Sequence, residues 1–254
     1  MEKLGYYKEL ESYRKENNWD AFEVGRVISE HKDRYIIRDA QKVYEGEIIG
    51  NLRFSAKNRS DLPAVGDWVS ISEYDEDKVL VHGVFPRKTI LERQAVGKHG
   101  EKQIIATNID YALIIQSVDR DFNINRIERY LTICHTAKVD AIIVLNKIDL
   151  ITDNELSTLT ESLKRRIKDI PVLQISNQSL QGLNKLMTIF EEGKTYCLLG
   201  SSGVGKSTLL NNLIGKQLMS TRTISESSNK GRHATTHREL QILENGGIII
   251  DNPG

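Results

Sequence analysis

The chain has 254 residues, and its 35 lysines and arginines balance 35 aspartates and glutamates, so the formal net charge at pH 7 is zero. This balance gives no global support for nucleic-acid binding, and any such partner must be met by local patches. The length suits one large or two modest domains, no apolar run approaches the roughly 20 residues of a membrane span, and the N-terminus has no apolar signal-peptide core.

Residues 1–20 are charged and aromatic, and they predict a short helical or partly ordered leader. Five short β-rich runs follow, and they are Phe22–Ile28, Arg34–Arg38, Val43–Ile49, Asp67–Ile71 and Val79–Val84. Five such strands in sequence predict a small all-β barrel over residues 21–92, for which the OB fold is the candidate. OB folds often bind oligonucleotides, but the fold alone does not assign that function, and these runs show no clear ladder of exposed aromatic residues.

Residues 93–103 are expected to link two domains. They belong to a locally basic stretch whose cations are Arg87, Lys88, Arg93, Lys98, His99 and Lys102. A bare run of charges is more often a solvated connector than a ligand site, so the stretch alone predicts no partner.

From residue 104 strands and helices alternate, which predicts an α/β domain over residues 104–254 with a mostly parallel six-stranded sheet. The predicted strands are Ala112–Val118, Ala141–Leu145, Val172–Ile175, Tyr196–Leu199, Glu239–Leu243 and Gly247–Ile250. The predicted helices are Asn123–Ala137, Asn154–Asp169, Leu180–Glu192 and Lys206–Ile214. Residues 217–237 have no periodicity and predict a long loop, which in a compact domain usually serves function.

A phosphate-binding loop is the most specific motif of the chain. The pattern G-x-x-x-x-G-K-[ST] is matched in full by Gly200, Ser201, Ser202, Gly203, Val204, Gly205, Lys206 and Ser207, with Thr208 next. A buried strand before it and a helix after it let backbone N–H groups and the helix N-terminus surround phosphate oxygens. Lys206 is predicted to bridge the β- and γ-phosphates and Ser207 to hold Mg²⁺. The alternative is a chance glycine-rich turn.

A second motif, N-K-x-D, closes an earlier strand with Asn146, Lys147 and Asp149. A carboxylate here can accept both the N1–H and the N2–H of guanine, and adenine offers neither donor in that arrangement. Asp149 is therefore predicted to select guanine, with Asn146 and Lys147 bracing the pocket. Ser176 and Asn177 end the next strand and predict, more weakly, a contact to the guanine oxygen; taken alone, each motif also fits a strand-end turn.

A third motif, D-x-P-G, runs from Asp251 to Gly254 after the last strand. Asp251 is predicted to reach Mg²⁺ through water, Gly254 to face the γ-phosphate, and Thr235 or Thr236 to close on Mg²⁺ from the long loop. Ras-like GTPases place the phosphate loop before N-K-x-D, whereas this chain reverses that order. Loops at the carboxyl ends of parallel strands build such sites, so rejoining the termini leaves the site intact. The domain is predicted to be a circularly permuted P-loop GTPase.

This motif order behind a five-stranded barrel resembles the RsgA family, also called YjeQ or YloQ, of ribosome small-subunit-dependent GTPases. The resemblance includes Leu62–Val69, Phe122–Asn123, Arg129–Leu131 and the loop Lys230–Leu240. It implies a protein that takes part in late small-subunit maturation, binds ribosomal RNA and hydrolyses GTP when the subunit stimulates it. The cysteine usage separately predicts a cytoplasmic protein. We expect a monomer without membrane contact.

The family's loop motif G-R-H-T-T-T corresponds to residues 231–236. The resemblance implies that His233 helps to position the attacking water. Ala234 replaces a threonine of the motif and removes one hydroxyl, while Asn252 replaces the commoner threonine of D-T-P-G.

Family members continue past D-x-P-G into a second switch helix and a small zinc-binding domain, and the resemblance therefore predicts a truncated form. Zinc is expected in the family, but no zinc ligands are visible in this sequence. Its two cysteines, Cys134 and Cys197, lie in apolar segments and predict buried, reduced thiols. We expect lower stability or slower hydrolysis than in a full-length relative.

The main hypothesis is a GTPase that acts in ribosome assembly, with GTP or GDP and Mg²⁺ as ligands and Lys206 and His233 as catalytic residues. Two alternatives stay open. One is a nucleotide-dependent binding module for ribosomal RNA or the ribosome with little turnover. The other is a P-loop enzyme that uses ATP.

Overall fold

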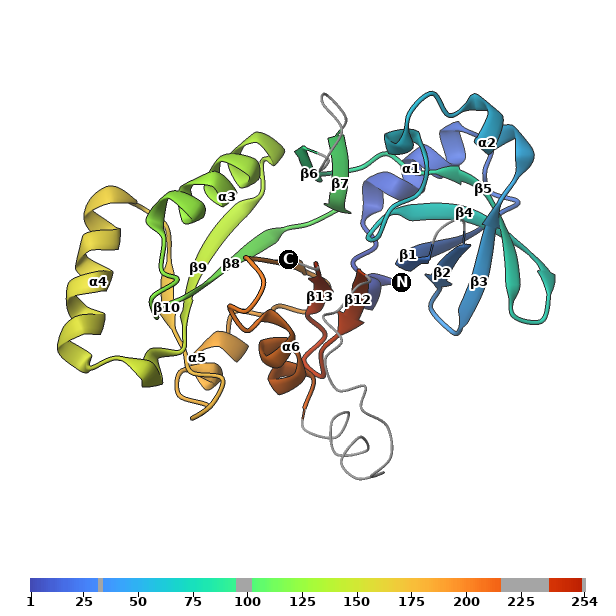
Figure 1. Ribbon diagram of the computed structural model, residues 1–254. Helices are drawn as coiled ribbons and strands as arrows, with labels where there is room; N and C mark the ends of the chain where they lie inside the picture. Colours follow the sequence, from blue (N-terminus) through green and yellow to red (C-terminus); the bar gives the residue numbers. More distant parts are fainter. Residues whose placement is uncertain (32–33, 95–101, 216–237, 253–254) are drawn as a thin grey trace, which may run out of the picture.

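The computed structural model of the chain describes residues 1–31, 34–94, 102–215 and 238–252. A barrel and an α/β domain lie side by side and share one sheet (Figure 1). In the described residues this sheet has eleven strands, in the order β10-β9-β8-β11-β13-β12-β1-β2-β3-β5-β4. The seam between the two parts is the antiparallel pairing of β1 with β12, where Ser29 lies opposite Glu239. A hydrogen bond of 3.2 Å from Ser29 Oγ to the Arg238 carbonyl reinforces it.

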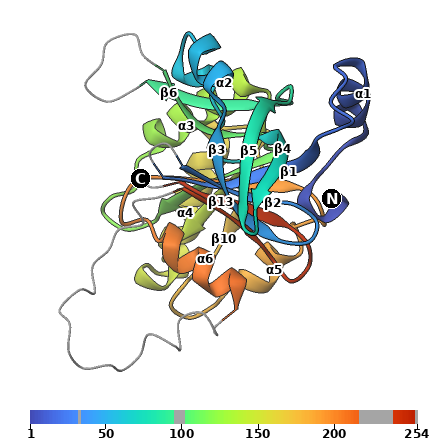
Figure 2. The ribbon, with the colours of Figure 1, turned by 90° about the vertical axis from the view of Figure 1, so that its right-hand side faces the viewer.

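The barrel follows the leader in the chain, and Figure 2 looks onto it. Its elements are β1 (Glu23–His31), β2 (Arg34–Arg38), β3 (Val43–Ile48), α2 (Gly50–Ser55), the 3₁₀ turn η2 (Arg59–Asp61), β4 (Trp68–Asp75) and β5 (Lys78–Val84). Pairing of β1 with β4 closes the ring of strands. Alternate residues, among them Val27, Ile37 and Ile71, are fully buried in its interior. The predicted small OB-like barrel is therefore confirmed.

The leader folds as η1 (Glu2–Leu4) and α1 (Lys8–Glu16) and packs against the barrel. Leu4 and Leu10 are buried with Trp68 and Phe85. Burial of these side chains stabilises a segment whose charged sequence gives little sign of a core.

The stretch predicted as a linker contains strand structure that the sequence analysis did not anticipate. Strand β6 (Ile90–Gln94) pairs antiparallel with β7 (Lys102–Thr107) as a separate two-stranded sheet. Leu91 is fully buried in the main core, while Glu92 and Arg93 stay partly exposed. One inward residue among charged neighbours is too weak a pattern to show a strand.

The α/β domain contains six of the described strands, and every pairing among them is parallel except that of β12 with β13. The strands are β8 (Tyr111–Ser117), β9 (Asp140–Asn146), β10 (Val172–Gln174), β11 (Thr195–Leu199), β12 (Glu239–Ile242) and β13 (Ile248–Asp251). The helices are α3 (Ile124–Ala137), η3 (Ile148–Leu150), α4 (Asp153–Arg166), α5 (Leu183–Met187) and α6 (Lys206–Ile214). The predicted mostly parallel six-stranded sheet is confirmed.

Helix α5 is shorter than the predicted Leu180–Glu192, because Gly182 precedes it with a φ of 77°. A Cβ atom at Gly182 would lie 2.1 Å from the Gln174 carbonyl oxygen, so this close turn needs glycine. The turn lets Leu183 and Leu186 reach the core, while residues 188–192 lead back to the sheet.

Helices cover both faces of the α/β sheet (Figure 1). Helices α3 and α4 bury Ile127 and Leu163 against one face, and α5 and α6 bury Leu186 and Leu209 against the other. Both cysteines are buried and free, as the sequence predicts. Burial raises the pKa of Cys134 to about 12 and raises that of Cys197 as well, so both remain thiols.

The leader, the barrel and the amino-terminal ends of the parallel strands meet at Arg26. Its guanidinium donates to the carbonyls of Leu4 (2.5 Å), Gly66 (3.2 Å) and Asn108 (3.2 Å), and to Thr195 Oγ1 (3.0 Å). Arg26 is only 1% exposed, and burial lowers its pKa to about 10. These bonds tie three segments into one junction.

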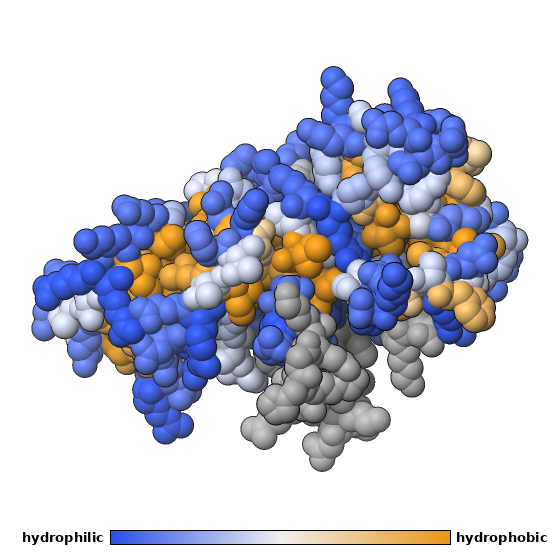
Figure 3. All heavy atoms as spheres, turned by 90° about the horizontal axis from the view of Figure 1, so that it is seen from above, coloured by the Kyte–Doolittle hydropathy of each residue, from blue (hydrophilic) through white to orange (hydrophobic). Residues whose placement is uncertain are grey.

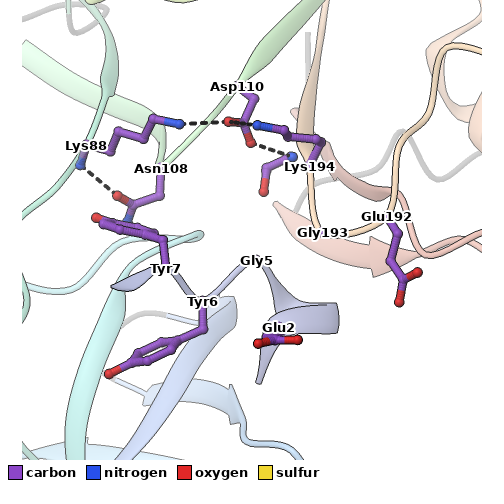
Figure 4. Close-up of a pocket in the computed structure, with 11 residues that line it drawn as sticks. Glu2, Gly5, Tyr6, Tyr7, Lys88, Asn108, Asp110, Glu192, Gly193 and Lys194 are labelled. Carbon is purple, nitrogen blue, oxygen red and sulfur yellow. Dashed lines mark hydrogen bonds and ion pairs between the residues drawn. The ribbon is translucent and has the colours of Figure 1, made fainter. Parts of the chain in front are cut away.

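Beside this junction lies a small pocket of about 240 Å³ (Figure 4). Asp110 stands at its wall and accepts from Lys88 at 2.9 Å and from the Thr195 N–H at 2.9 Å. None of the described helices is long and apolar enough to cross a membrane.

Candidate nucleotide-binding site

The phosphate loop connects β11 to α6 and lies at the carboxyl edge of the sheet. Gly205 has a φ of 98°, and a Cβ atom there would lie 2.4 Å from Asn146 Nδ2. Glycine is therefore required both for the turn and for the close approach of the N-K-x-D segment. Ser202 and Gly203 are exposed at the tip of the loop, as are Ser207 and Thr208 at the start of α6. The loop backbone and the helix N-terminus together face solvent, as phosphate binding requires.

Lys206 lies inside this loop. It is 7% exposed, and its Nζ donates to the carbonyls of Gly200 at 2.7 Å and Ser201 at 3.0 Å. Burial lowers its pKa below the ordinary 10.5, and the negative charge of Asp251 opposes that shift. The ammonium group is thus held at the loop, where it can reach a phosphate.

The N-K-x-D segment meets the phosphate loop through Asn146. Its Nδ2 donates to the Val204 carbonyl at 2.8 Å, and its Oδ1 accepts from the Asn177 N–H at 3.2 Å. Asn177 in turn donates from Nδ2 to the Gly205 carbonyl at 2.9 Å. Residues about 30 to 60 positions apart along the chain therefore form one hydrogen-bonded unit.

Asp149 is exposed, and its carboxylate accepts a hydrogen bond from the buried Ser176 hydroxyl. The Ser176 Oγ also accepts from the Gln178 and Ser179 N–H groups at 3.2 and 3.0 Å. These bonds orient the carboxylate at the end of β9 while leaving it accessible to a base.

Lys147 turns back over the site with a φ of 65° and donates to Asp119 Oδ2 at 2.9 Å. Burial opposes ionisation of Asp119, but hydrogen bonds from Lys147, the Asp121 N–H and Ser117 outweigh it and lower its pKa. Asp119 has no place in the sequence motifs, and only the fold brings it to Lys147.

Arg126 is a second residue that the motifs do not predict. It lies in the first turn of α3, and its Nη1 donates to Ser201 Oγ at 3.0 Å. The two residues are 75 positions apart, and no local pattern in the sequence indicates their contact.

The residues predicted to hold Mg²⁺ fall into two groups. Ser207 is exposed in the first turn of α6, and Asp251 is buried at the end of β13, close enough for its charge to act on Lys206. A hydroxyl and a carboxylate beside a phosphate site are the oxygen ligands that Mg²⁺ prefers, so this donor set fits the ion. Thr235, Thr236, His233 and Gly254 lie outside the described residues. Within the described ranges, no group of three or more His, Cys, Asp and Glu residues could hold a metal ion.

A groove of about 720 Å³ runs between β6 and α3 on the upper side of Figure 1. Its cationic lining residues are Arg87, Lys88, Arg93, Arg129 and Lys138, and Glu92 is an acidic one. Figure 3 views this side and shows hydrophilic side chains around hydrophobic patches. The groove lining is thus rich in cations although the net charge of the chain is zero, and two of these cations, Arg87 and Lys88, form ion pairs with Asp67 and Asp110.

Three comparisons place the chain among known proteins. The family model described as RsgA GTPase matches residues 84–254. "Small ribosomal subunit biogenesis GTPase RsgA 2" of Lactiplantibacillus plantarum is 39% identical over 231 residues, which cover 91% of this chain and 65% of that protein. "Small ribosomal subunit biogenesis GTPase RsgA" of Opitutus terrae is 40% identical over 239 residues, which cover 90% of this chain and 64% of that protein. The chain thus spans slightly less than two thirds of the length of these curated relatives.

Two solved structures share the fold. YjeQ from Thermotoga maritima has a TM-score of 0.66 at 23% identity, and the match covers 91% of this chain and 74% of that one. YloQ, described as a circularly permuted GTPase, has a TM-score of 0.63 at 24% identity, with 92% and 71% covered. These similarities confirm the predicted fold class, a barrel followed by a permuted P-loop domain.

Proposed function

Because the chain belongs to the RsgA GTPase family, we propose that it binds guanine nucleotides and hydrolyses GTP to GDP and phosphate in late maturation of the small ribosomal subunit. The observation that carries this proposal is the contact between the two motifs. Asn146 of N-K-x-D donates to the Val204 carbonyl of the phosphate loop at 2.8 Å, so a base beside Asp149 and a phosphate at Lys206 can belong to one nucleotide.

The residues of the site have distinct roles in this proposal. The Asp149 carboxylate accepts from N1–H and N2–H of guanine, and Ser176 orients it. Lys206 and the loop N–H groups neutralise charge that develops on the β–γ bridge during attack by water. Ser207 and Asp251, with Thr235 or Thr236, would hold Mg²⁺, and the ion would further neutralise phosphate charge. His233 helps to position the water.

We further propose that the partner is the small subunit with its ribosomal RNA and that the protein acts in the cytoplasm as a monomer. The groove between β6 and α3 supports the RNA contact, because Arg93, Arg129 and Lys138 line it together with Arg87 and Lys88, whose charges are paired with Asp67 and Asp110. Binding through phosphates of RNA should weaken steeply as salt rises.

Substitution of Asp149 tests the base assignment. Asp149→Asn replaces an acceptor for two N–H groups with an amide, so we expect the Kd for GTP to rise about 100-fold, while xanthosine triphosphate, which carries an oxygen in place of the amino group, gains affinity. Titration with fluorescent nucleotides measures both effects. Asp153→Asn, an exposed aspartate at the start of α4, is the matched control.

An unchanged GTP-to-ATP preference in Asp149→Asn would contradict this assignment and favour an ATP-using enzyme. Single-turnover hydrolysis with and without small subunits then separates a GTPase from a binding module. Stimulated phosphate release is the expected result, and nucleotide-dependent subunit binding without release would favour the module.

A further inference from the structure

The first turn of α3 points a cation at the phosphate loop. Asn123 caps this helix by accepting the Arg126 N–H at 3.2 Å, which fixes the backbone from which the arginine side chain leaves. Ile127, the next residue, is fully buried against the sheet. The Arg126 side chain is therefore anchored at its base, and its Nη1 donates to Ser201 Oγ at 3.0 Å.

Ser201 stands between two cations. Its hydroxyl accepts from Arg126, and its backbone carbonyl accepts from Lys206 Nζ at 3.0 Å. A hydrogen bond that holds the Ser201 side chain also holds the peptide group whose oxygen meets the lysine. The phosphate-loop motif leaves this position free, so the link belongs to this chain's own residues and not to the motif.

We propose that Arg126 is a positioning residue for Lys206 and acts through Ser201. It fixes the tip of the loop so that the Ser201 carbonyl orients the lysine ammonium before the β- and γ-phosphates arrive. The proposal rests on the proposed GTP hydrolysis and extends it to α3.

Turnover should depend on this link more than nucleotide binding does. Loop N–H groups and the base pocket supply most of the binding and do not need Arg126, whereas the alignment of Lys206 matters most in the transition state. Loss of the link should therefore lower kcat and leave KM and the Kd for GDP nearly unchanged.

A double-mutant cycle tests the route through Ser201. We expect Arg126→Ala and Ser201→Ala each to lower single-turnover kcat about tenfold, and the double variant to lose no more than either one, because both changes break the same hydrogen bond. Arg126→Lys, which can still donate to the hydroxyl, should recover most of the rate. Arg165→Ala, an 82% exposed arginine on α4, is the matched control.

Losses that multiply in the double variant, or a wild-type rate in Arg126→Ala, would overturn the proposal. Amide hydrogen exchange of residues 200–206 in the nucleotide-free chain gives a second readout, and faster exchange in both single variants is expected. A wild-type chain that hydrolyses no GTP would refute the proposed function. In that case unchanged exchange in the variants would also refute the positioning role, and faster exchange would support it.

Discussion

Two buried cations lie at opposite edges of the same sheet. Their surroundings differ in a way that suits one of them to ligand binding and the other to stabilising the fold. Lys206 is at the carboxyl edge and is 7% exposed, and Arg26 is at the amino edge and is 1% exposed. Burial lowers the pKa of both groups, and every hydrogen bond described for them goes to a carbonyl or a hydroxyl.

The difference is in what surrounds each charge. Arg26 uses its donors on three carbonyls and one hydroxyl, which come from the leader, the barrel and the α/β domain. Lys206 donates to two carbonyls of its own loop and has exposed neighbours in Ser202 and Gly203. A cation whose partners come from distant segments stabilises the fold, and a cation beside exposed loop residues can be reached by an anion.

Removal of Lys206 should give the largest effect, and we expect this effect on GTP turnover and not on stability. We expect Lys206→Ala to lower GTP turnover about a thousand-fold, because a preorganised charge at the β–γ bridge is lost. The free energy of unfolding should change by less than about 1 kcal/mol, because no distant segment depends on the lysine. Phosphate release and urea unfolding measure the two quantities, with Lys185→Ala on an exposed face of α5 as control. A large loss of stability would show that Lys206 also stabilises the fold and would contradict the difference between the two cations.

Removal of Arg26 should show the opposite pattern. Arg26→Ala removes the guanidinium donor from the carbonyls of Leu4 and Asn108 and leaves the Gly66 carbonyl with Asn108 Nδ2 as its donor. We expect a loss of about 3 kcal/mol in the free energy of unfolding. Turnover per folded molecule should stay near that of the wild type. Urea unfolding of this variant against Arg38→Ala, an exposed arginine on β2, checks the size of the loss. Equal midpoints for the two variants would show that the junction does not depend on Arg26.

Alkaline pH should produce the smallest of the three effects. The pKa of Lys206 lies below 10.5, so kcat/KM for GTP should decline as pH rises with a midpoint below that value. Between the folded and unfolded pKa values the unfolded chain binds more protons, so the contribution of Lys206 to stability rises with pH while activity falls. The residual activity of Lys206→Ala should lack this decline, and a decline shared by that variant would point to another group.

The sequence predicts those parts of the site whose chemistry is local. Gly200 to Ser207 and Asn146 to Asp149 each place a recognisable set of groups within a few residues, at the end of a strand whose apolar run is also visible. The carboxyl ends of parallel strands meet at one edge, so the convergence of these loops follows from the alternation of strands and helices.

The parts that escaped prediction depend on contacts between distant residues. Arg126 meets Ser201 across 75 positions, Lys147 meets Asp119 across 28, and Arg26 meets Thr195 across 169. Each partner alone is an ordinary polar residue, and its role exists only after the sheet has formed. The β6–β7 pairing is hidden for a related reason, since a single buried Leu91 cannot establish a period of two within a charged stretch.

The strand seam has a mechanical consequence. Ser29 lies opposite Glu239, and Glu239 lies opposite Asp251, so these three residues form a row that crosses β1, β12 and β13. A sideways displacement of the barrel would be transmitted along this row of backbone bonds to the carboxylate beside Lys206. The barrel and the strand end that carries Asp251 are therefore mechanically connected, so a displacement of one is expected to strain the backbone of the other.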